Sequence, residues 1–270
     1  MIYLDKTEVV QDRFGDNTLK VKIPTTTNYG SVILDSFFSS VSNGNHTIKW
    51  LYESDSELFT LQVIVDYLRE KNSECSIELV MPYVPNARQD RYVSDRAFTL
   101  KTFCKVINNM NFDRVTILDP HSNVTTALLD RVCVEPYLIN TSSFDDSVVK
   151  MYPDEGAAKK YNATDKDIIG MKHRDKEGSI VDYQLLNFVE GTKDVLIVDD
   201  ICSYGGTFVK AAEALKAKGV EHIYLLVSHC ENNIEKGKVF EYIDKVFTTD
   251  DICTLQHEKI YYVKKYREEA

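Results

Sequence analysis

The chain has 270 residues, of which 43% are hydrophobic, and carries a net charge of -10 at pH 7. This length and apolar content allow one large domain or two modest ones with buried cores. The acidic charge argues against a general nucleic-acid-binding protein, because such proteins need a basic surface to displace counterions from phosphates.

The first half of the chain predicts alternating strands and helices. Apolar residues such as Leu58, Leu61 and Leu68 recur at helical spacing, whereas other segments alternate in the manner of strands. Asp55 or Ser56 is expected to cap the first helix. The expected elements are strands at residues 19–23, 47–52, 76–81 and 114–118 and helices at residues 57–71 and 98–110.

A charged loop follows the strand expected at residues 76–81. The prolines and charges of residues 82–92 exclude a regular helix or a core strand. The strand at residues 114–118 likewise ends in a polar segment, Asp119-Pro120-His121. Polar loops that follow buried strands are candidate binding sites.

The second half repeats this plan without a detectable sequence repeat. It is expected to form two α/β domains, residues 1–140 and 141–270, each with a mainly parallel sheet flanked by helices. The expected elements are strands at residues 148–152, 167–171, 180–188, 195–198, 222–228, 245–249 and 259–263 and helices at residues 155–161, 208–218 and 234–242.

The most informative stretch is residues 194–207. Residues 195–198 form a short apolar run, which is typical of a strand buried on both faces of a parallel sheet. Asp199 and Asp200 follow at its carboxyl end, where ligands of open α/β sheets gather. Two carboxylates there can accept hydrogen bonds from sugar hydroxyls or hold a cation.

A glycine-rich turn comes next. Gly205 and Gly206 let backbone amides approach an anion, and Thr207 is expected to be the N-cap of the helix at residues 208–218. The free amides and dipole of that helix favour a phosphate. The order of parts therefore predicts a site for a phosphorylated sugar.

These motifs resemble those of a known family. Residues 194–207 resemble the phosphoribosyl-diphosphate (PRPP) binding motif of the type I phosphoribosyltransferase fold. Pro82-Tyr83 followed by Ala87-Arg88-Gln89-Asp90-Arg91 is similar to the more specific signature of ribose-phosphate diphosphokinase (PRPP synthetase), which makes PRPP from ATP and ribose 5-phosphate. Further matches run in the same order, and the likeness covers about residues 10–250: Phe14-Gly15-Asp16, Asp119-Pro120-His121, Tyr152-Pro153-Asp154-Glu155-Gly156 and Lys172-His173-Arg174.

The resemblance implies two phosphoribosyltransferase-like domains and a role for each matched residue. The planar guanidinium forks of arginine suit the phosphates of ATP, and lysine and arginine can stabilise the charge of a diphosphate in transfer. The implied ATP-binding residues are Phe14, Asp16, Arg88, Gln89 and Arg91; the ribose-phosphate-binding residues are Asp199, Asp200, Ser203, Tyr204, Gly205, Gly206 and Thr207; the magnesium ligands are His121 and Asp154; and the catalytic residues are Lys172 and Arg174.

The chain departs from the family pattern in the turn that follows Cys202. Where the family carries an acid and a threonine, this chain has Ser203 and Tyr204, so the pocket for the 5-substituent of the sugar differs. Tyr204 brings an aromatic face that can stack on a base. ADP-ribose is therefore an alternative acceptor to ribose 5-phosphate. The family's regulatory loop after Ser228-His229 is also missing, so control by ADP is not expected.

The resemblance predicts a magnesium-dependent enzyme that transfers the β,γ-diphosphate of ATP to the C1 hydroxyl of ribose 5-phosphate or ADP-ribose and releases AMP. A phosphoribosyltransferase that consumes PRPP is a first alternative, which residues 87–91 oppose because such an enzyme has no need of them. A catalytically silent regulatory homologue is a second alternative. Ser203 and Tyr204 favour it slightly, and the retained Lys172 and Arg174 oppose it.

The expected surroundings follow from the same sequence. The chain has no apolar run near the ~18 residues of a membrane helix, no secretory signal at Met1 to Asp5, and six cysteines without a C-x-x-C pair. We expect a cytoplasmic protein with reduced thiols, no structural metal and no membrane or nucleic-acid partner. The family's use of Phe14 and Asp16 across a subunit boundary implies a homo-oligomer.

Overall fold

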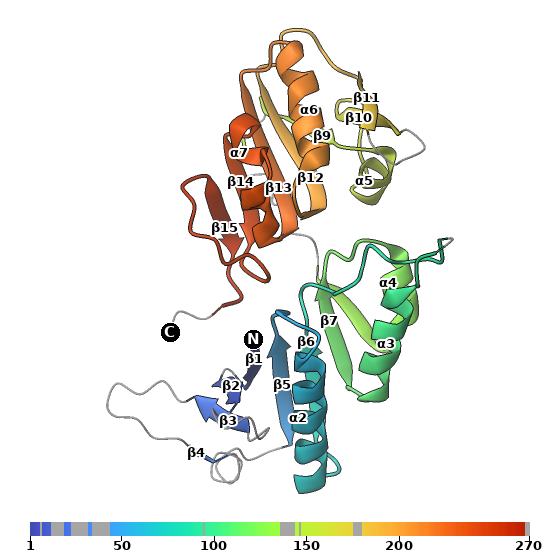
Figure 1. The fold of residues 1–270 in the computed structure, drawn as a ribbon, viewed down its shortest axis with the longest axis vertical. Coiled ribbons are helices and arrows are strands. Elements are labelled where there is room, and N and C mark those ends of the chain that lie inside the picture. The colour runs from blue at the N-terminus through green and yellow to red at the C-terminus, as the bar shows by residue number, and fades with distance from the viewer. Residues whose placement is uncertain are drawn as a thin grey trace. The chain divides into compact units, whose positions relative to one another are not determined.

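The computed structural model describes residues 1–5, 7–11, 19–22, 32–33, 44–93, 95–135, 144–145, 147–174 and 180–267. The chain forms two compact units, Met1–Pro136 and Tyr137–Arg267 (Figure 1). Both are α/β units with helices packed against a sheet that contains a run of parallel strands, which confirms the predicted fold class, although antiparallel pairs make up about half of the first sheet.

The first unit carries, within the described residues, an eight-stranded sheet in the order β4-β3-β2-β1-β5-β6-β7-β8. The run β5 to β8 is parallel, as expected, but β1 to β4 pair antiparallel, and β1 is also antiparallel to β5. Only two residues join β1 to β2, and so short a connection can join only antiparallel neighbours. The elements are β1 Ile2–Leu4, β2 Thr7–Gln11, β3 Leu19–Lys22, β4 Val32–Ile33, β5 Asn45–Trp50, α2 Glu57–Lys71, β6 Ser76–Val80, α3 Thr99–Asn109, β7 Arg114–Leu118, α4 Asn123–Leu128 and β8 Val132–Glu135.

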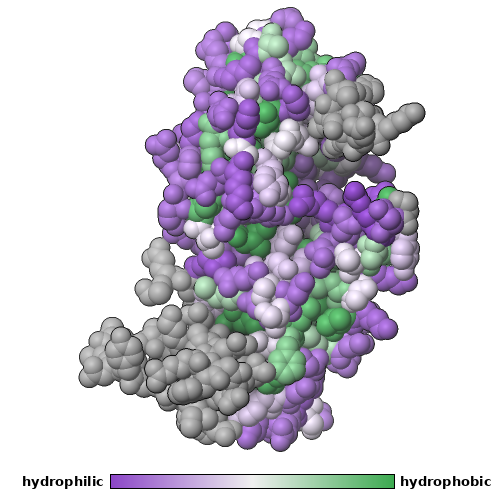
Figure 2. Space-filling model, in the orientation of Figure 1, coloured by the Kyte–Doolittle hydropathy of each residue, from purple (hydrophilic) through white to green (hydrophobic). Residues whose placement is uncertain are grey.

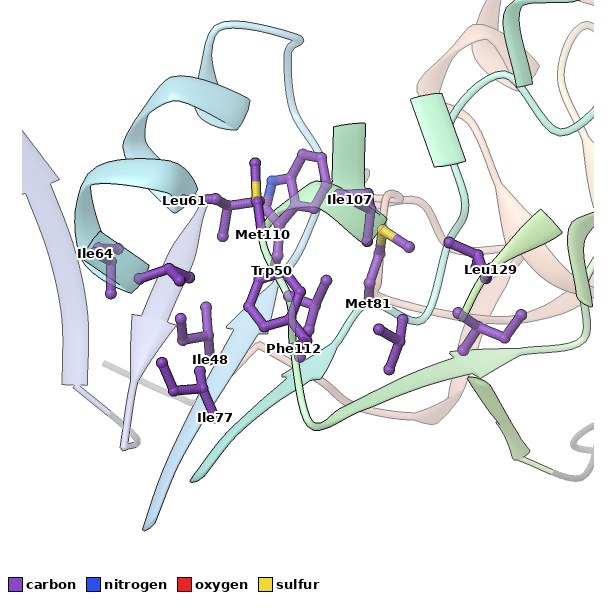
Figure 3. Close-up of a cluster of buried hydrophobic side chains, with 14 of the residues drawn as sticks. Ile48, Trp50, Leu61, Ile64, Ile77, Met81, Ile107, Met110, Phe112 and Leu129 are labelled. Atoms are coloured by element: carbon purple, nitrogen blue, oxygen red, sulfur yellow. The ribbon is translucent and has the colours of Figure 1, made fainter. Parts of the chain in front are cut away.

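The core of this unit packs α2 and α3 against the sheet. Trp50 at the end of β5 is fully buried and stacks on Phe103 of α3 at 6.1 Å between ring centroids. Figure 3 shows how Trp50 lies among apolar side chains such as Leu61, Met81 and Ile107. The helical spacing recognised in residues 57–71 therefore corresponds to the buried stripe of α2.

Glu57 organises the start of α2 in place of the predicted cap. Ser56 stands at the N-cap but makes no side-chain capping hydrogen bond. The Glu57 carboxylate accepts hydrogen bonds from Trp50 Nε1 at 2.9 Å, from the Glu53 amide at 2.8 Å and from the amino group of Met1. Burial would raise the pKa of Glu57, but these hydrogen bonds outweigh it and lower that pKa.

The second unit carries, within the described residues, a seven-stranded sheet in the order β11-β10-β9-β12-β13-β14-β15. All its strands pair in parallel except β10 with β11. The strands predicted for this half are present, and the region expected as one short helix is a 3₁₀-helix followed by α7. The elements are β9 Val149–Tyr152, α5 Glu155–Lys160, β10 Ile168–Arg174, β11 Ile180–Leu186, β12 Asp194–Cys202, α6 Gly206–Ala217, β13 His222–Cys230, η2 Asn232–Lys236, α7 Val239–Tyr242, β14 Lys245–Thr249 and β15 Ile260–Lys264.

The surface drawn in colour in Figure 2 is largely hydrophilic, with hydrophobic side chains scattered among polar ones. Among the residues that the structure describes, no helix combines the length and apolar character needed to cross a bilayer.

Candidate functional site

The carboxyl ends of β9 and β12 bring two acidic segments together in the second unit. Val195 pairs with Val149 and Ile197 with Met151, so this parallel register places Asp199 level with the residues that follow β9. Asp154 lies two residues beyond the end of β9 and acts electrostatically on Asp199. Asp199 and Asp200 lie in the last part of β12, which continues to Cys202, rather than after a strand that ends at Val198 as the sequence predicted. The predicted acids nevertheless belong to a cluster of carboxylates.

Asp199 and Asp200 form a tightly coupled pair. Asp200 is buried, and Lys160 Nζ lies 3.4 Å from its Oδ2. Burial, followed by the neighbouring charges of Asp200 and Asp154, raises the pKa of Asp199 well above its ordinary value. A ligand that donates hydrogen bonds or brings positive charge would stabilise the ionised form of this carboxylate.

Asp154 and Lys172 form an ion pair beside this acid pair. Asp154 is the N-cap of α5 and accepts a hydrogen bond from the Ala157 amide at 2.9 Å, while Lys172 Nζ donates to its Oδ2 at 2.6 Å. Burial acts to raise the pKa of Asp154, but the bond from Lys172 and the helix amides lower it overall. Asp154 is therefore ionised and oriented.

Lys172 lies in β10, which pairs antiparallel with β11. The strand predicted to end at Met171 continues to Arg174 because β11 supplies hydrogen-bond partners along its length. Arg174 ends β10, and its side chain lies outside the described part of the structure. A hairpin therefore presents Lys172 to the site.

Tyr183 completes this cluster and was missed in the sequence. It lies opposite Lys172 on β11 and donates a hydrogen bond to the Pro153 carbonyl at 3.0 Å. Burial, followed by the charges of Asp154 and Asp199, raises the pKa of Tyr183, so the hydroxyl stays protonated. Gly170 makes room for it, since an added Cβ there would lie 2.1 Å from the tyrosine oxygen.

The turn after β12 differs from expectation in one detail. Gly205, not Thr207, is the N-cap of α6, and its φ of +75° is a left-handed conformation that glycine adopts without strain. The helix therefore begins at Gly206, and Thr207 belongs to its first turn. A Cβ added at Gly206 would meet nothing within 4 Å, so the side of Gly206 that would bear a side chain faces open space.

Ser203 and Tyr204 face different surroundings in the same turn. The Tyr204 side chain is 56% exposed, whereas the Ser203 hydroxyl donates a hydrogen bond to Glu231 after β13. Glu231 carries no recognised motif, and only the pairing of β12 with β13 brings it to the turn.

The first unit carries the loop at residues 82–92. Arg88 and Arg91 are exposed, and Arg91 Nε donates to the buried Asp90 at 2.9 Å. Burial would raise the pKa of Asp90, but Arg91 and the nearby His121 help to lower it. Asp90, for which the sequence suggested no role, thus orients Arg91. Gln89 is half-buried, and its backbone N–H donates to the Asn86 backbone carbonyl at 2.9 Å.

Asp119 and His121 follow β7 in the same unit. Asp119 is buried with a φ of +39°, a conformation uncommon for residues other than glycine, and His121 is exposed. The two residues matched to magnesium ligands, His121 and Asp154, thus lie in different units. Phe14 and Asp16 lie outside the described residues.

The donors of the second unit fit a magnesium ion that is bound together with a substrate. Within the described residues, no three His, Cys, Asp or Glu side chains converge to hold a metal by themselves. Magnesium, however, is commonly held by one or two carboxylates together with substrate phosphates. The coupled carboxylates Asp199 and Asp200 beside Asp154 are hard oxygen donors of this kind.

Residues 146–261, which contain the acidic cluster of the second unit, match the family model described as phosphoribosyl transferase domain. Over nearly its whole length the chain is related to ribose-phosphate pyrophosphokinases. It is 29% identical over 274 residues to that of Vibrio vulnificus, covering 95% of this chain and 82% of the relative. It is 27% identical over 261 residues to that of Thermococcus kodakarensis, covering 92% and 86%.

A solved structure, the phosphoribosylpyrophosphate synthetase of Mycobacterium smegmatis, has the same fold. It superposes with a TM-score of 0.68 at 15% identity, covering 95% of this chain and 85% of that one. The expected resemblance to ribose-phosphate diphosphokinases is thereby confirmed, since the chain is similar over 95% of its length to enzymes of that name, and the solved structure shows the same fold.

Proposed function

We propose that this protein transfers the β,γ-diphosphate of ATP to the C1 hydroxyl of a 5-phosphorylated ribose and releases AMP. The observation that carries the proposal is that relatives named ribose-phosphate pyrophosphokinase match 95% of the chain. The second unit also brings Asp154, Lys172 and the Asp199–Asp200 pair together at the ends of neighbouring strands. Ribose 5-phosphate, which would give PRPP, is the acceptor that the names of these relatives support.

The acidic pair has the chemistry to bind the sugar. Asp199 and Asp200 would accept hydrogen bonds from the vicinal ribose hydroxyls, which offsets the repulsion that raises the pKa of Asp199. The amides of Gly206 and Thr207 would bind the phosphate of the 5-substituent. These contacts would orient the C1 hydroxyl and limit its motion before reaction.

Lys172 and Arg174 would stabilise the group in transfer. As the C1 oxygen bonds to the β-phosphorus and the bond to the α-phosphate oxygen breaks, negative charge spreads over the equatorial oxygens. Lys172 is oriented by the hydrogen bond that its Nζ donates to Asp154 Oδ2 at 2.6 Å. Asp154 in the second unit and His121 in the first are each proposed as magnesium ligands from the family motifs, and magnesium would supply further positive charge to the diphosphate.

Arg88, Gln89 and Arg91 are the proposed ATP-binding residues, with Phe14 and Asp16 proposed from the family motif alone. The exposed guanidinium of Arg91, aligned by buried Asp90, suits a phosphate. A homo-oligomer and a cytoplasmic location are part of the same proposal.

ADP-ribose is a second candidate acceptor, and the turn at Ser203 and Tyr204 favours it. The ring of Tyr204 is 56% exposed and offers a stacking face for a base. The product would be ADP-ribose 1-diphosphate. The residue pattern supports this acceptor, and the names of the relatives do not.

The test is incubation of the purified protein with magnesium, ATP and each acceptor in turn, with AMP release followed by chromatography. Tyr204→Thr should shift the ratio of kcat/KM toward ribose 5-phosphate by several-fold, since a lost stacking contact is worth roughly 1 kcal/mol. If wild type has equal kcat/KM for both acceptors and the Tyr204→Thr variant does not change that ratio, ADP-ribose is no longer supported as an acceptor. Consumption of PRPP together with a base would show a phosphoribosyltransferase instead, and no turnover with any acceptor would contradict the proposed function.

A further inference from the structure

The segment after β13, residues 231–239, contacts each residue of the turn that precedes α6. The Glu231 carboxylate accepts the hydrogen bond from the Ser203 hydroxyl. Gly237 packs so closely on Tyr204 that an added Cβ would lie 2.0 Å from the Tyr204 carbonyl oxygen. We call residues 231–239 the supporting segment.

The third contact is steric. A Cβ added at Gly205 would lie 2.0 Å from Cγ2 of Val239, which is fully buried. The side of Gly205 that would bear a side chain is therefore filled by Val239. Each residue of the turn, Ser203, Tyr204 and Gly205, therefore makes one contact with the supporting segment, and these contacts restrict the conformation of the turn.

The supporting segment is itself well anchored. The Glu231 amide donates to the Cys202 carbonyl at 2.7 Å, which fixes its start beside the end of β12. Asn232 exchanges two hydrogen bonds with Thr254, at 2.8 and 2.9 Å. Ile234 is fully buried, as is Val239. A segment held in this way can keep the turn in one conformation.

Glu231 also places a negative charge at the turn. Its Oε2 accepts from Ser203 Oγ and from Asn233 Nδ2, the latter at 3.2 Å. Because the Ser203 hydroxyl already donates to a carboxylate, its proton is not available to a phosphate. A carboxylate close to a bound dianion raises its energy.

We propose that Glu231 is a positioning and specificity-determining residue, which holds the Ser203–Gly205 turn in its binding conformation and disfavours a dianionic 5-phosphate there. This inference rests on the proposed function, because it takes the turn to be the site of the 5-substituent. It adds to that function that Glu231 sets which charge of the acceptor's 5-substituent the site prefers.

Two variants of Glu231 separate its two roles. Glu231→Gln keeps an oxygen that can accept from Ser203 and removes the charge, so the KM for ribose 5-phosphate should fall about 5-fold, a change of roughly 1 kcal/mol. Glu231→Ala also removes the acceptor, and its KM should exceed that of Glu231→Gln by about 10-fold. The KM for ATP should stay unchanged in both.

Glu235→Gln is the matched control, since Glu235 is an exposed carboxylate of the same segment. It should leave both KM values at the wild-type level. Gly237→Ala tests the steric contact independently and should raise the KM for the acceptor without changing that for ATP. A purely structural role would instead lower Tm and kcat and alter both KM values together.

The deciding experiment pairs these kinetics with calorimetric titration of inorganic phosphate into each protein without ATP. Tighter phosphate binding by Glu231→Gln than by wild type and by Glu235→Gln supports the proposal, even if AMP release fails with every acceptor and the proposed function falls. Phosphate affinities that are equal in wild type, Glu231→Gln and Glu231→Ala overturn it, whatever the enzyme's activity.

Discussion

Replacing Lys172 with alanine tests whether this lysine serves the reaction or only its ion pair with Asp154. The two side chains are 22% and 34% exposed. A partly exposed ion pair contributes about 1 kcal/mol or less to stability, so Tm should fall by only about 4 °C. If Lys172 stabilises the transferring diphosphate, kcat should instead fall by about 10²- to 10³-fold, or roughly 2.7–4 kcal/mol of activation free energy.

The assay is AMP release at saturating ATP and acceptor, together with the Kd for ATP from calorimetry. The Kd should change little, because the lost interaction is made mainly in the transition state. Lys159→Ala is the control, since Lys159 is an exposed lysine of α5 near the same edge of the sheet. A Lys172→Ala protein with wild-type kcat, or one whose rate loss is matched by weaker ATP binding, would refute the assignment.

Three further predictions follow from other residues of the structure. Glu57→Gln should lower the free energy of unfolding of the first unit by roughly 2 kcal/mol at pH 7 in denaturant titrations. Because the folded state lowers the pKa of Glu57, the stability difference between wild type and variant should be complete above the unfolded pKa of about 4.3. It should shrink as the pH falls through the folded-state pKa. Gly205→Ala should lower Tm and acceptor affinity, and adding Val239→Ala should recover only part of the loss, since the steric contact is relieved but the positive φ remains; full recovery would show that the φ is unimportant. Chelation of divalent cations should abolish AMP release while circular dichroism stays unchanged, and added magnesium should restore it; activity that survives chelation would contradict the magnesium proposal.

Periodicity and strand-end chemistry were enough to predict most of the fold. The apolar stripe of α2 and the apolar run of β12 lie where their patterns indicated, because burial on one face or on both selects apolar residues at regular positions. The end of β12 was predicted too early, since the strand continues beyond Val198, through Asp199 and Asp200, to Cys202. Short elements such as β1 and α4 were missed, since three to six residues are too few for a periodic signal. The antiparallel edge of the first sheet was missed for the same reason.

Site residues that belong to a local sequence motif could be predicted. Site residues that reach the site only through the pairing of strands could not. Thr207 was wrongly expected to cap α6, because the sequence does not reveal that Gly205 adopts a positive φ two residues earlier. Tyr183 and Glu231 reach the site only through the pairing of β10 with β11 and of β12 with β13. Neither residue has a sequence signature, so the structure was needed to identify them.

The central claim is that this protein moves a diphosphate from ATP to the C1 hydroxyl of a phosphorylated ribose. The most direct measurement is ³¹P nuclear magnetic resonance of a reaction containing the protein, magnesium, ATP and ribose 5-phosphate, repeated with ADP-ribose. We expect equimolar AMP and a sugar 1-diphosphate from at least one acceptor, and loss of both signals with Lys172→Ala. Release of ADP or of free diphosphate instead of AMP, or no change in the ATP signals with either acceptor, would contradict it.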